Sequence, residues 1–203
     1  MQYLKDEIRN NIAEKALIEF KQKGYTGASI RTISKNSGTS VGNMYKYFQS
    51  KEDLYEALIG SVYNQVMIQI AQFSKVELNE KAENIFYELM ENILEIVDEN
   101  STELSILLNK SEGSKYENCK ITFIDLITNL VTEMISYELS LKGKQLKDNF
   151  ILHLLSYNLV ESIALILISK DDSVEIKKLI IIIIEIFYGN IAEKLDSYQM
   201  GEY

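Results

Sequence analysis

Apolar residues recur every three or four positions along nearly the whole chain of 203 residues, which is the period of an amphipathic α-helix. The first stripe runs from Leu4 to Phe20, and Gly24 follows it as a helix stop. A long helix of about 24 residues is expected from Ser50, which with Asp53 has the spacing of a capping box. The pattern predicts an all-α fold of about nine helices, over residues 4–20, 30–37, 41–48, 50–74, 85–97, 104–108, 121–141, 146–169 and 174–195.

Residues 29–54 predict two short helices joined by a tight turn, which is a helix-turn-helix. Ser29 and Ser40 are suited to cap the two helices, and Gly38 lies in the turn between them. The buried side of this motif is expected to consist of Ile30, Ile33, Met44 and Phe48.

The other side of the second helix starts with small residues, so the backbone can come close to the floor of a groove. Asn43 can pair with an adenine edge, and Lys46 can pair with a guanine edge or a phosphate. The outward face is expected to consist of Val41, Gly42, Asn43, Lys46 and Tyr47.

Charge is distributed unevenly along the chain. The net charge is −9, but residues 1–60 hold nine Lys/Arg against seven Asp/Glu, and residues 61–203 hold twelve against twenty-three. The stretch from Phe20 to Lys51 carries six basic residues and no acidic one. Such a stretch is typical of a site for a polyanion, and the alternative is an ordinary solvated face.

Composition narrows the class of protein. The chain has no proline, which suits helices. Cys119 is its single cysteine, so a disulfide framework is excluded and a reducing, cytoplasmic location is expected. The first residues are charged and do not resemble a secretory signal. The apolar runs 159–168 and 179–187 fall short of a membrane-spanning length, so they predict buried helices and no membrane partner.

Enzymatic chemistry has little support in the sequence. His153 is the only histidine, and neither a G-x-G-x-x-G nor a G-x-x-x-x-G-K-S/T phosphate loop occurs. We therefore expect no enzyme activity, no cofactor and no metal site.

The segment from Ser29 onward resembles the DNA-binding domain of the TetR family of transcriptional regulators, over about residues 5–60. A turn glycine, a G-x-x-Y-x-Y-F run and an S-K-E-x-L start occur together in register. The residues that carry the resemblance are Ser29, Gly38, Ser40, Gly42, Tyr45, Tyr47, Phe48, Ser50, Lys51, Glu52 and Leu54.

The resemblance implies three parts: a helix-turn-helix domain over 1–49, a connecting helix over 50–74, and an effector-binding and dimerisation domain over 75–203. Tyr45, Tyr47 and Lys51 would meet phosphates of double-stranded DNA. Thr39 stands where valine is commoner in the family. The full set of implied DNA contacts is Arg31, Thr32, Ser40, Val41, Gly42, Asn43, Tyr45, Lys46, Tyr47 and Lys51.

The last two predicted helices are too apolar to be covered by one side of a single chain. Residues 179–184 are apolar on all sides, and the helix around 150–168 has the same excess. These helices predict a homodimer built on a four-helix interface. The alternative is a monomer with both helices at its centre.

The effector is expected to be a small apolar molecule, neutral or cationic because the C-terminal part is acidic. We expect a ligand-responsive repressor that the effector releases from a palindromic operator. The alternative is a helical protein-binding or scaffold module that does not bind DNA. Candidate effector-binding residues are Tyr87, Tyr116, Asn118, His153, Tyr157 and Glu161.

Overall fold

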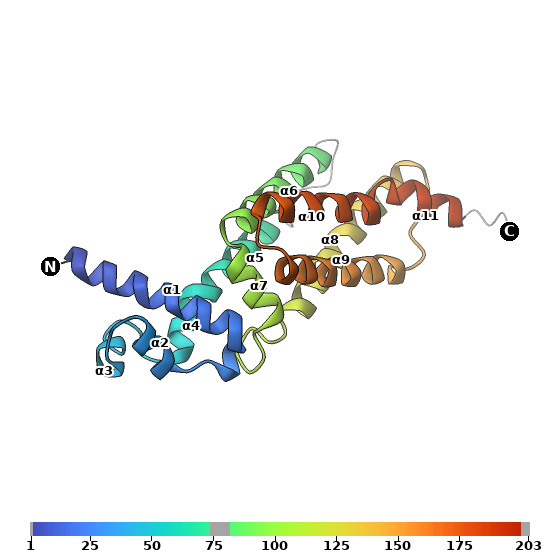
Figure 1. Cartoon of the computed structure of the whole chain (residues 1–203). Helices are drawn as coiled ribbons and strands as arrows, with labels where there is room; N and C mark the ends of the chain where they lie inside the picture. The colour runs from blue at the N-terminus through green and yellow to red at the C-terminus, as the bar shows by residue number, and fades with distance from the viewer. Residues whose placement is uncertain (1, 74–81, 200–203) are drawn as a thin grey trace. The chain divides into compact units, whose positions relative to one another are not determined.

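The computed structural model describes residues 2–73 and 82–199, and every regular element in them is helical (Figure 1). The all-α class predicted from the sequence is therefore confirmed. The elements are α1 (Gln2–Gly27), α2 (Ile30–Asn36), α3 (Val41–Met44), α4 (Lys51–Tyr55), the π-helical segment η1 (Glu56–Gly60), α5 (Ser61–Phe73), α6 (Ala82–Glu99), α7 (Ser101–Asn109), α8 (Cys119–Leu141), α9 (Phe150–Ser169), α10 (Ser173–Tyr188) and α11 (Ile191–Gln199).

The described chain forms two compact units. The first unit comprises Met1–Met67 and Glu99–Cys119, and the second comprises Ile68–Asp98 and Lys120–Tyr203. The predicted division into a helix-turn-helix domain, a connecting helix and an effector domain assigns a function to each part, whereas the two units are defined by packing alone. The predicted division therefore stays a prediction.

The N-terminal unit is built by helix caps at the positions that the sequence predicts. Ser29, Ser40 and Ser50 each accept a hydrogen bond from a backbone N–H three residues later, which starts α2, α3 and α4. Gly24 interrupts α1 with a φ of 68°, and Gly38 forms the turn after α2 with a φ of 66°. Both backbone conformations favour glycine.

The long helix predicted from Ser50 runs from Lys51 to Phe73 without a break, and residue 74 lies outside the described residues. Its periodicity did not indicate the π-helical turn over Glu56–Gly60. Such turns are rare insertions that often mark functional positions.

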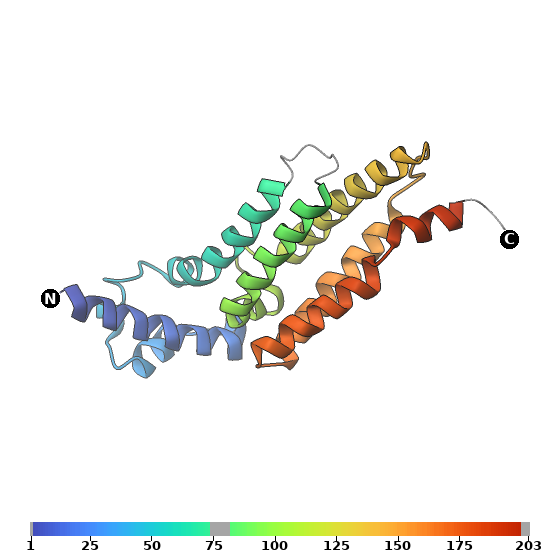
Figure 2. The same ribbon diagram turned by 90° about the horizontal axis from the view of Figure 1, so that it is seen from above.

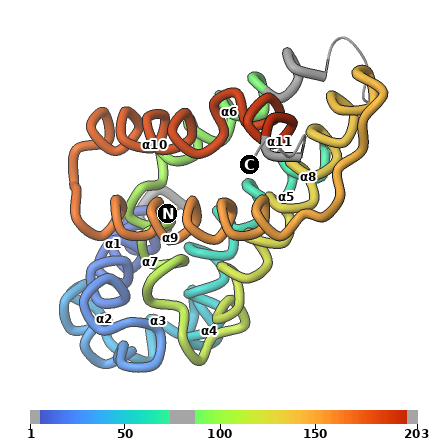
Figure 3. The backbone as a smooth tube through the Cα atoms, turned by 90° about the vertical axis from the view of Figure 1, so that its right-hand side faces the viewer, coloured from blue at the N-terminus to red at the C-terminus, as the bar shows by residue number. Residues whose placement is uncertain are grey.

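The C-terminal unit has a core made by α8, α9 and α11. Val131, Ile135 and Leu139 from α8 pack with Leu152, Ala192 and Leu195. Helices α9 and α10 run side by side, joined by a short connection (Figures 2 and 3). These contacts bury one side of each helix.

The helix predicted over 174–195 is two helices in the structure. It is interrupted at Gly189 and Asn190, and Asn190 has a φ of 53°. Asparagine adopts this left-handed conformation more readily than other side-chain-bearing residues do, so the chain can turn here. The helix predicted from residue 146 starts at Phe150.

Helix α9 is longer than the apolar run 159–168. Within the described residues it is the one helix long and apolar enough to cross a membrane by length and composition, and 33% of its most apolar 18-residue window is buried. Ser156 on its buried side bonds to the carbonyl of Leu152 and to the hydroxyl of Tyr188, so this side is packed against protein.

Candidate nucleic-acid interface

The helix-turn-helix is held together by a small apolar core. Ile33, Met44 and Phe48 are buried, as the sequence predicts, while Ile30 is partly exposed. Ser34 and Ser37 are also buried, and each hydroxyl donates to a backbone carbonyl three residues earlier. The two serines therefore carry no unpaired polar group, and they leave room for α2 and α3 to cross.

The regular part of α3 is shorter than the predicted helix over 41–48. After Met44 the N–H groups of Lys46 and Tyr47 bond to carbonyls three residues earlier, so the helix tightens into a turn. Phe48 still reaches the core because its own N–H bonds to the carbonyl of Met44.

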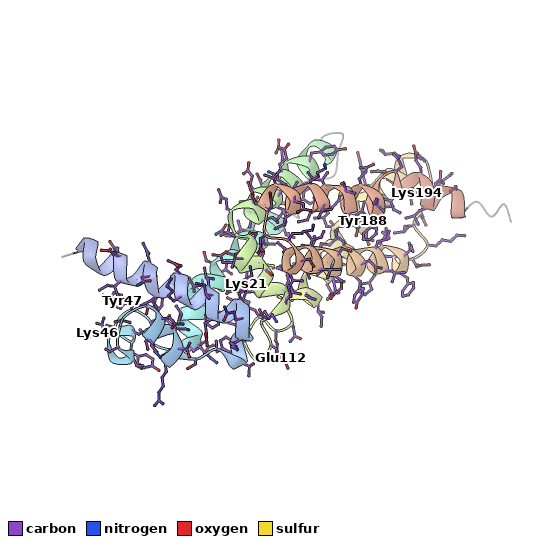
Figure 4. All side chains as sticks on the ribbon, viewed as in Figure 1. Lys21, Lys46, Tyr47, Glu112, Tyr188 and Lys194 are labelled. Carbon is purple, nitrogen blue, oxygen red and sulfur yellow. The ribbon has the colours of Figure 1, made fainter. Side chains whose placement is uncertain are left out.

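All ten side chains or positions predicted to contact DNA are accessible to solvent. Tyr45 is 48% exposed, and Figure 4 shows Lys46 and Tyr47 beside α3. The exposed positions are Arg31, Ser40, Gly42, Tyr45 and Lys46. The partly exposed positions are Thr32, Val41, Asn43, Tyr47 and Lys51.

Asn43 is fixed more firmly than its position at the surface suggested. Its backbone N–H donates to the hydroxyl of Ser40 at 3.1 Å, and its side-chain amide donates to the hydroxyl of Thr39 at 2.8 Å. In the sequence, Thr39 stands out only as a departure from the family pattern. The spacing of four residues between two polar side chains is the signal that could have indicated this bond.

The side chain of Lys51 forms hydrogen bonds with the protein backbone in the structure. Its ammonium donates to the carbonyls of Tyr25, Thr26 and Ala28 at 2.8, 3.3 and 3.4 Å, and it lies 4.6 Å from the ring centre of Tyr25. An ammonium has three N–H donors, so these bonds can occupy all of them. The expected contact between Lys51 and a phosphate stays a prediction, and the observed role is to hold the end of α1.

Two residues of α1 support the motif and were not among the predicted contacts. The guanidinium of Arg9 lies over the ring of Phe48 at 5.4 Å, and the side-chain amide of Asn11 donates to the carbonyl of Ser37 at 2.9 Å. Arg9 is exposed, so it adds a positive charge beside the end of α3. Arg9 is not part of the apolar stripe of α1, and the stripe gave no signal of this contact.

The basic character expected for this region is present at the surface. Arg31, Lys35 and Lys46 are all exposed and lie on α2 or beside α3. Glu19 is the acidic residue turned inward here: it is buried and accepts the N–H of Ser29.

A second cluster joins the segment after α7 to the start of the long helix. Tyr116 donates to the carboxylate of Glu56 at 2.5 Å, and the Lys115 ammonium lies 2.6 Å from the same carboxylate. Tyr55, one residue earlier, bonds to the hydroxyl of Ser111 at 2.8 Å. These contacts all lie within the N-terminal unit.

Burial and hydrogen bonding both shift the pKa values of this cluster. Burial alone would raise the pKa of Glu56, but the bonds from Lys115 and Tyr116 lower it below the ordinary value. Burial, together with the bond to Glu56, raises the pKa of Tyr116 to about 12. Burial likewise raises the pKa of Tyr55 to about 12.

The six residues predicted to bind an effector are not brought together by either unit. Tyr116 and Asn118 belong to the N-terminal unit and the other four to the C-terminal unit. Polar residues on these helices are expected to need a partner or a ligand, and three of the six have a partner within the protein; their role in effector binding stays a prediction. Tyr116 pairs with Glu56, Glu161 with Lys120 at 2.8 Å, and His153 lies 3.4 Å from Thr128. The remaining side chains, those of Tyr87, Asn118 and Tyr157, are exposed.

The C-terminal unit has an open groove of about 410 Å³ between α6 and α10. Its lining combines apolar side chains with two lysines and one carboxylate. The residues are Asp98, Val174, Lys177, Lys178, Ile181 and Ile182. None of them was predicted from the sequence, because the helical stripe of α10 predicts a packed face rather than a groove.

Two capped helices crossing over a small core, with a basic and polar outer face, define a helix-turn-helix of the kind that enters the major groove of DNA. Residues 12–58 match the sequence family described as "Bacterial regulatory proteins, tetR family". Together with the relatives below, this match identifies residues 12–58 as a DNA-binding segment of the TetR type, as the motifs predict. Members of this family are regulators and not enzymes.

The relatives agree with this placement. The chain is 35% identical over 60 residues to "Probable HTH-type transcriptional regulator YttP" of Bacillus subtilis, a match that covers 30% of this chain and 29% of YttP. It is 22% identical over 130 residues to the biofilm operon icaADBC negative regulator IcaR of Staphylococcus epidermidis, covering 64% of this chain and 69% of IcaR. The fold resembles that of a TetR-family regulator from Bordetella parapertussis, with a TM-score of 0.64, 18% identity and coverage of 89% and 94% of the two chains.

Proposed function

We propose that the protein is a ligand-responsive, DNA-binding transcriptional repressor that acts as a homodimer in the cytoplasm. The observation that carries this proposal is the outer face of α3 and its flanking turn. On this face Asn43, Lys46 and Tyr47 are accessible, while the opposite side of the same turn is buried in the core.

The proposed DNA contacts divide into two kinds. Arg31, Tyr45 and Tyr47 would bind phosphates and so fix the orientation of the protein, while Asn43 and Lys46 would reach base edges. Gly42 assists because a Cβ there would meet open space, which leaves room for the groove floor to approach. Thr32, Ser40, Val41 and Lys51 remain proposed secondary contacts.

The exposed apolar side chains of α9 and α10 support a homodimer. Phe150 is 70% exposed, Leu165 65% and Ile186 60%. A soluble chain seldom leaves so many large apolar side chains uncovered on two adjacent helices. A second copy of the same pair would cover them in a four-helix interface, and it would set two recognition segments about one DNA turn apart on a palindromic operator.

Repression, as opposed to activation, is supported by the relative IcaR, which is named as a negative transcriptional regulator. A small apolar effector would bind in the C-terminal unit and favour a different distance between the two recognition segments of the dimer. The affinity for the operator would then fall, and the repressor would leave the DNA. In the C-terminal unit, the groove between α6 and α10 is a candidate place for such a molecule, because it offers an apolar lining with a few polar groups.

DNA binding is tested by fluorescence anisotropy with duplexes that cover the region upstream of the protein's own gene. We expect an affinity that falls steeply with salt, because each phosphate contact releases counterions. Lys46→Ala should weaken binding and reduce the salt dependence, whereas the control Lys142→Ala, on the C-terminal unit, should do neither. A folded chain whose binding to these duplexes does not depend on salt or on Lys46 would contradict the proposal and favour a protein partner for the helix-turn-helix.

A further inference from the structure

Thr39 lies in the turn between α2 and α3, next to the proposed base-reading residue. Its own N–H donates to the carbonyl of Ser34 in α2 at 2.9 Å, so its position is fixed by the preceding helix. Its hydroxyl accepts a hydrogen bond of 2.8 Å from the side-chain amide of Asn43. Thr39 therefore connects the orientation of the Asn43 side chain to the frame of the motif.

The bond to Thr39 leaves Asn43 able to read a base. A side-chain amide has two N–H donors and a carbonyl oxygen, and Thr39 takes one of the donors. The carbonyl oxygen and the second N–H remain, which is the acceptor and donor pair that matches the N6 and N7 edge of adenine. The bond to Thr39 already restricts the rotation of the side-chain amide, so the Asn43 side chain loses little further freedom when it binds.

We propose that Thr39 is a specificity-determining residue that positions Asn43 to read adenine in the major groove. This inference rests on the proposed DNA-binding function and adds a residue outside the expected contact set. Thr39 acts through Asn43 and need not touch DNA itself. A freely rotating asparagine would present its amide to a base in several orientations, and a fixed one presents the same edge each time.

The experiment selects binding sites from a random duplex library with the full-length chain and four variants. Wild type should enrich a palindrome with a preferred adenine at one position of each half-site. The Asn43→Ala variant should lose the preference for adenine at that position. Thr39→Val keeps the shape of the side chain and removes the hydroxyl, and it should reduce the preference for that adenine about fivefold or more. Thr39→Ser keeps the hydroxyl and should retain the preference, and Ser37→Ala, a hydroxyl removed elsewhere in the turn, should leave this adenine unaffected.

Two results would overturn the inference while leaving DNA binding intact. One is that Thr39→Val keeps the adenine preference of wild type. The other is that the base lost in Asn43→Ala is guanine, thymine or cytosine. If the folded wild-type chain enriches no sequence at all, the proposed function fails as well, so the two failures are distinguishable. Thermal unfolding of each variant is the control that separates a change in base preference from a loss of fold.

Discussion

The hydroxyl of Tyr116 donates a hydrogen bond of 2.5 Å to the carboxylate of Glu56, a residue 60 positions earlier in the chain. This bond holds the segment after α7 against the π-helical turn at the start of the long helix. A Cβ on Gly60 would collide with the same hydroxyl and with the Glu56 carboxylate. The close approach of Tyr116 therefore depends on the absence of a side chain at Gly60.

Gly60→Ala should destabilise the protein although alanine is the better helix former. Alanine gains about 1 kcal/mol in helix propensity, but the buried Tyr116 hydroxyl must move and its bond to a charged group, worth about 1.5–3 kcal/mol, is lost. We expect a net loss of about 1 kcal/mol in chemical denaturation. In the Tyr116→Phe background the hydroxyl is absent, so Gly60→Ala should cost less than in wild type. Equal costs in the two backgrounds would show that the contact has no energetic role.

The same cluster should make stability depend on pH in the acid range. The pKa of Glu56 lies below its ordinary value of 4.5 because Lys115 and Tyr116 donate to its charged form. Such a group stabilises the fold above its unfolded pKa, and this contribution is lost as the pH falls through the lower folded pKa.

The substitution Glu56→Gln keeps an oxygen that can accept the hydrogen bond of Tyr116, and it removes the carboxyl group that titrates. We expect its free energy of unfolding to fall less than that of wild type between about pH 6 and pH 3. The measurement is urea unfolding at a series of pH values, with Glu117→Gln, an exposed carboxylate of the same segment, as control. Parallel curves for wild type and Glu56→Gln would argue against the assigned pKa shift.

Lys46→Ala and Lys51→Ala should separate DNA binding from stability. Lys51 donates to three carbonyls at the end of α1, so its removal should cost about 1–2 kcal/mol and lower the melting temperature by several degrees. Lys46 is exposed, and its removal should leave the melting temperature nearly unchanged while weakening DNA binding. Thermal unfolding and anisotropy measure the two effects. A wild-type melting temperature in Lys51→Ala would contradict the structural role of this lysine.

Local chemistry explains which features could be predicted from the sequence. Ser29, Ser40 and Gly38 act through bonds and dihedral angles within a few residues, so their caps and turn are confirmed at the predicted positions. The pairing of Tyr116 with Glu56 joins segments far apart in the chain, and periodicity carries no information about such contacts. Tyr116 was consequently interpreted as a candidate ligand contact, and its polar group turned out to have a partner within the protein.

The proposed dimer can be tested with two charged substitutions on its apolar face. Leu165→Glu on α9 and Ile186→Glu on α10 replace exposed side chains, so each folded monomer should tolerate them. In a four-helix interface both changes would bury carboxylates without partners, which costs several kcal/mol per subunit. Wild type should sediment at twice the 23.4 kDa of one chain, and the double variant should sediment as a monomer.

Ile121→Glu is the matched control for this experiment, because Ile121 is also exposed, at 59%, but lies on α8 outside the proposed interface. It should remain dimeric. The double variant should also bind operator DNA far more weakly than wild type, since two linked recognition segments are needed for tight binding to a palindrome. A double variant that stays dimeric at micromolar concentration would place the interface elsewhere on the chain and leave the apolar face of α9 and α10 to another partner.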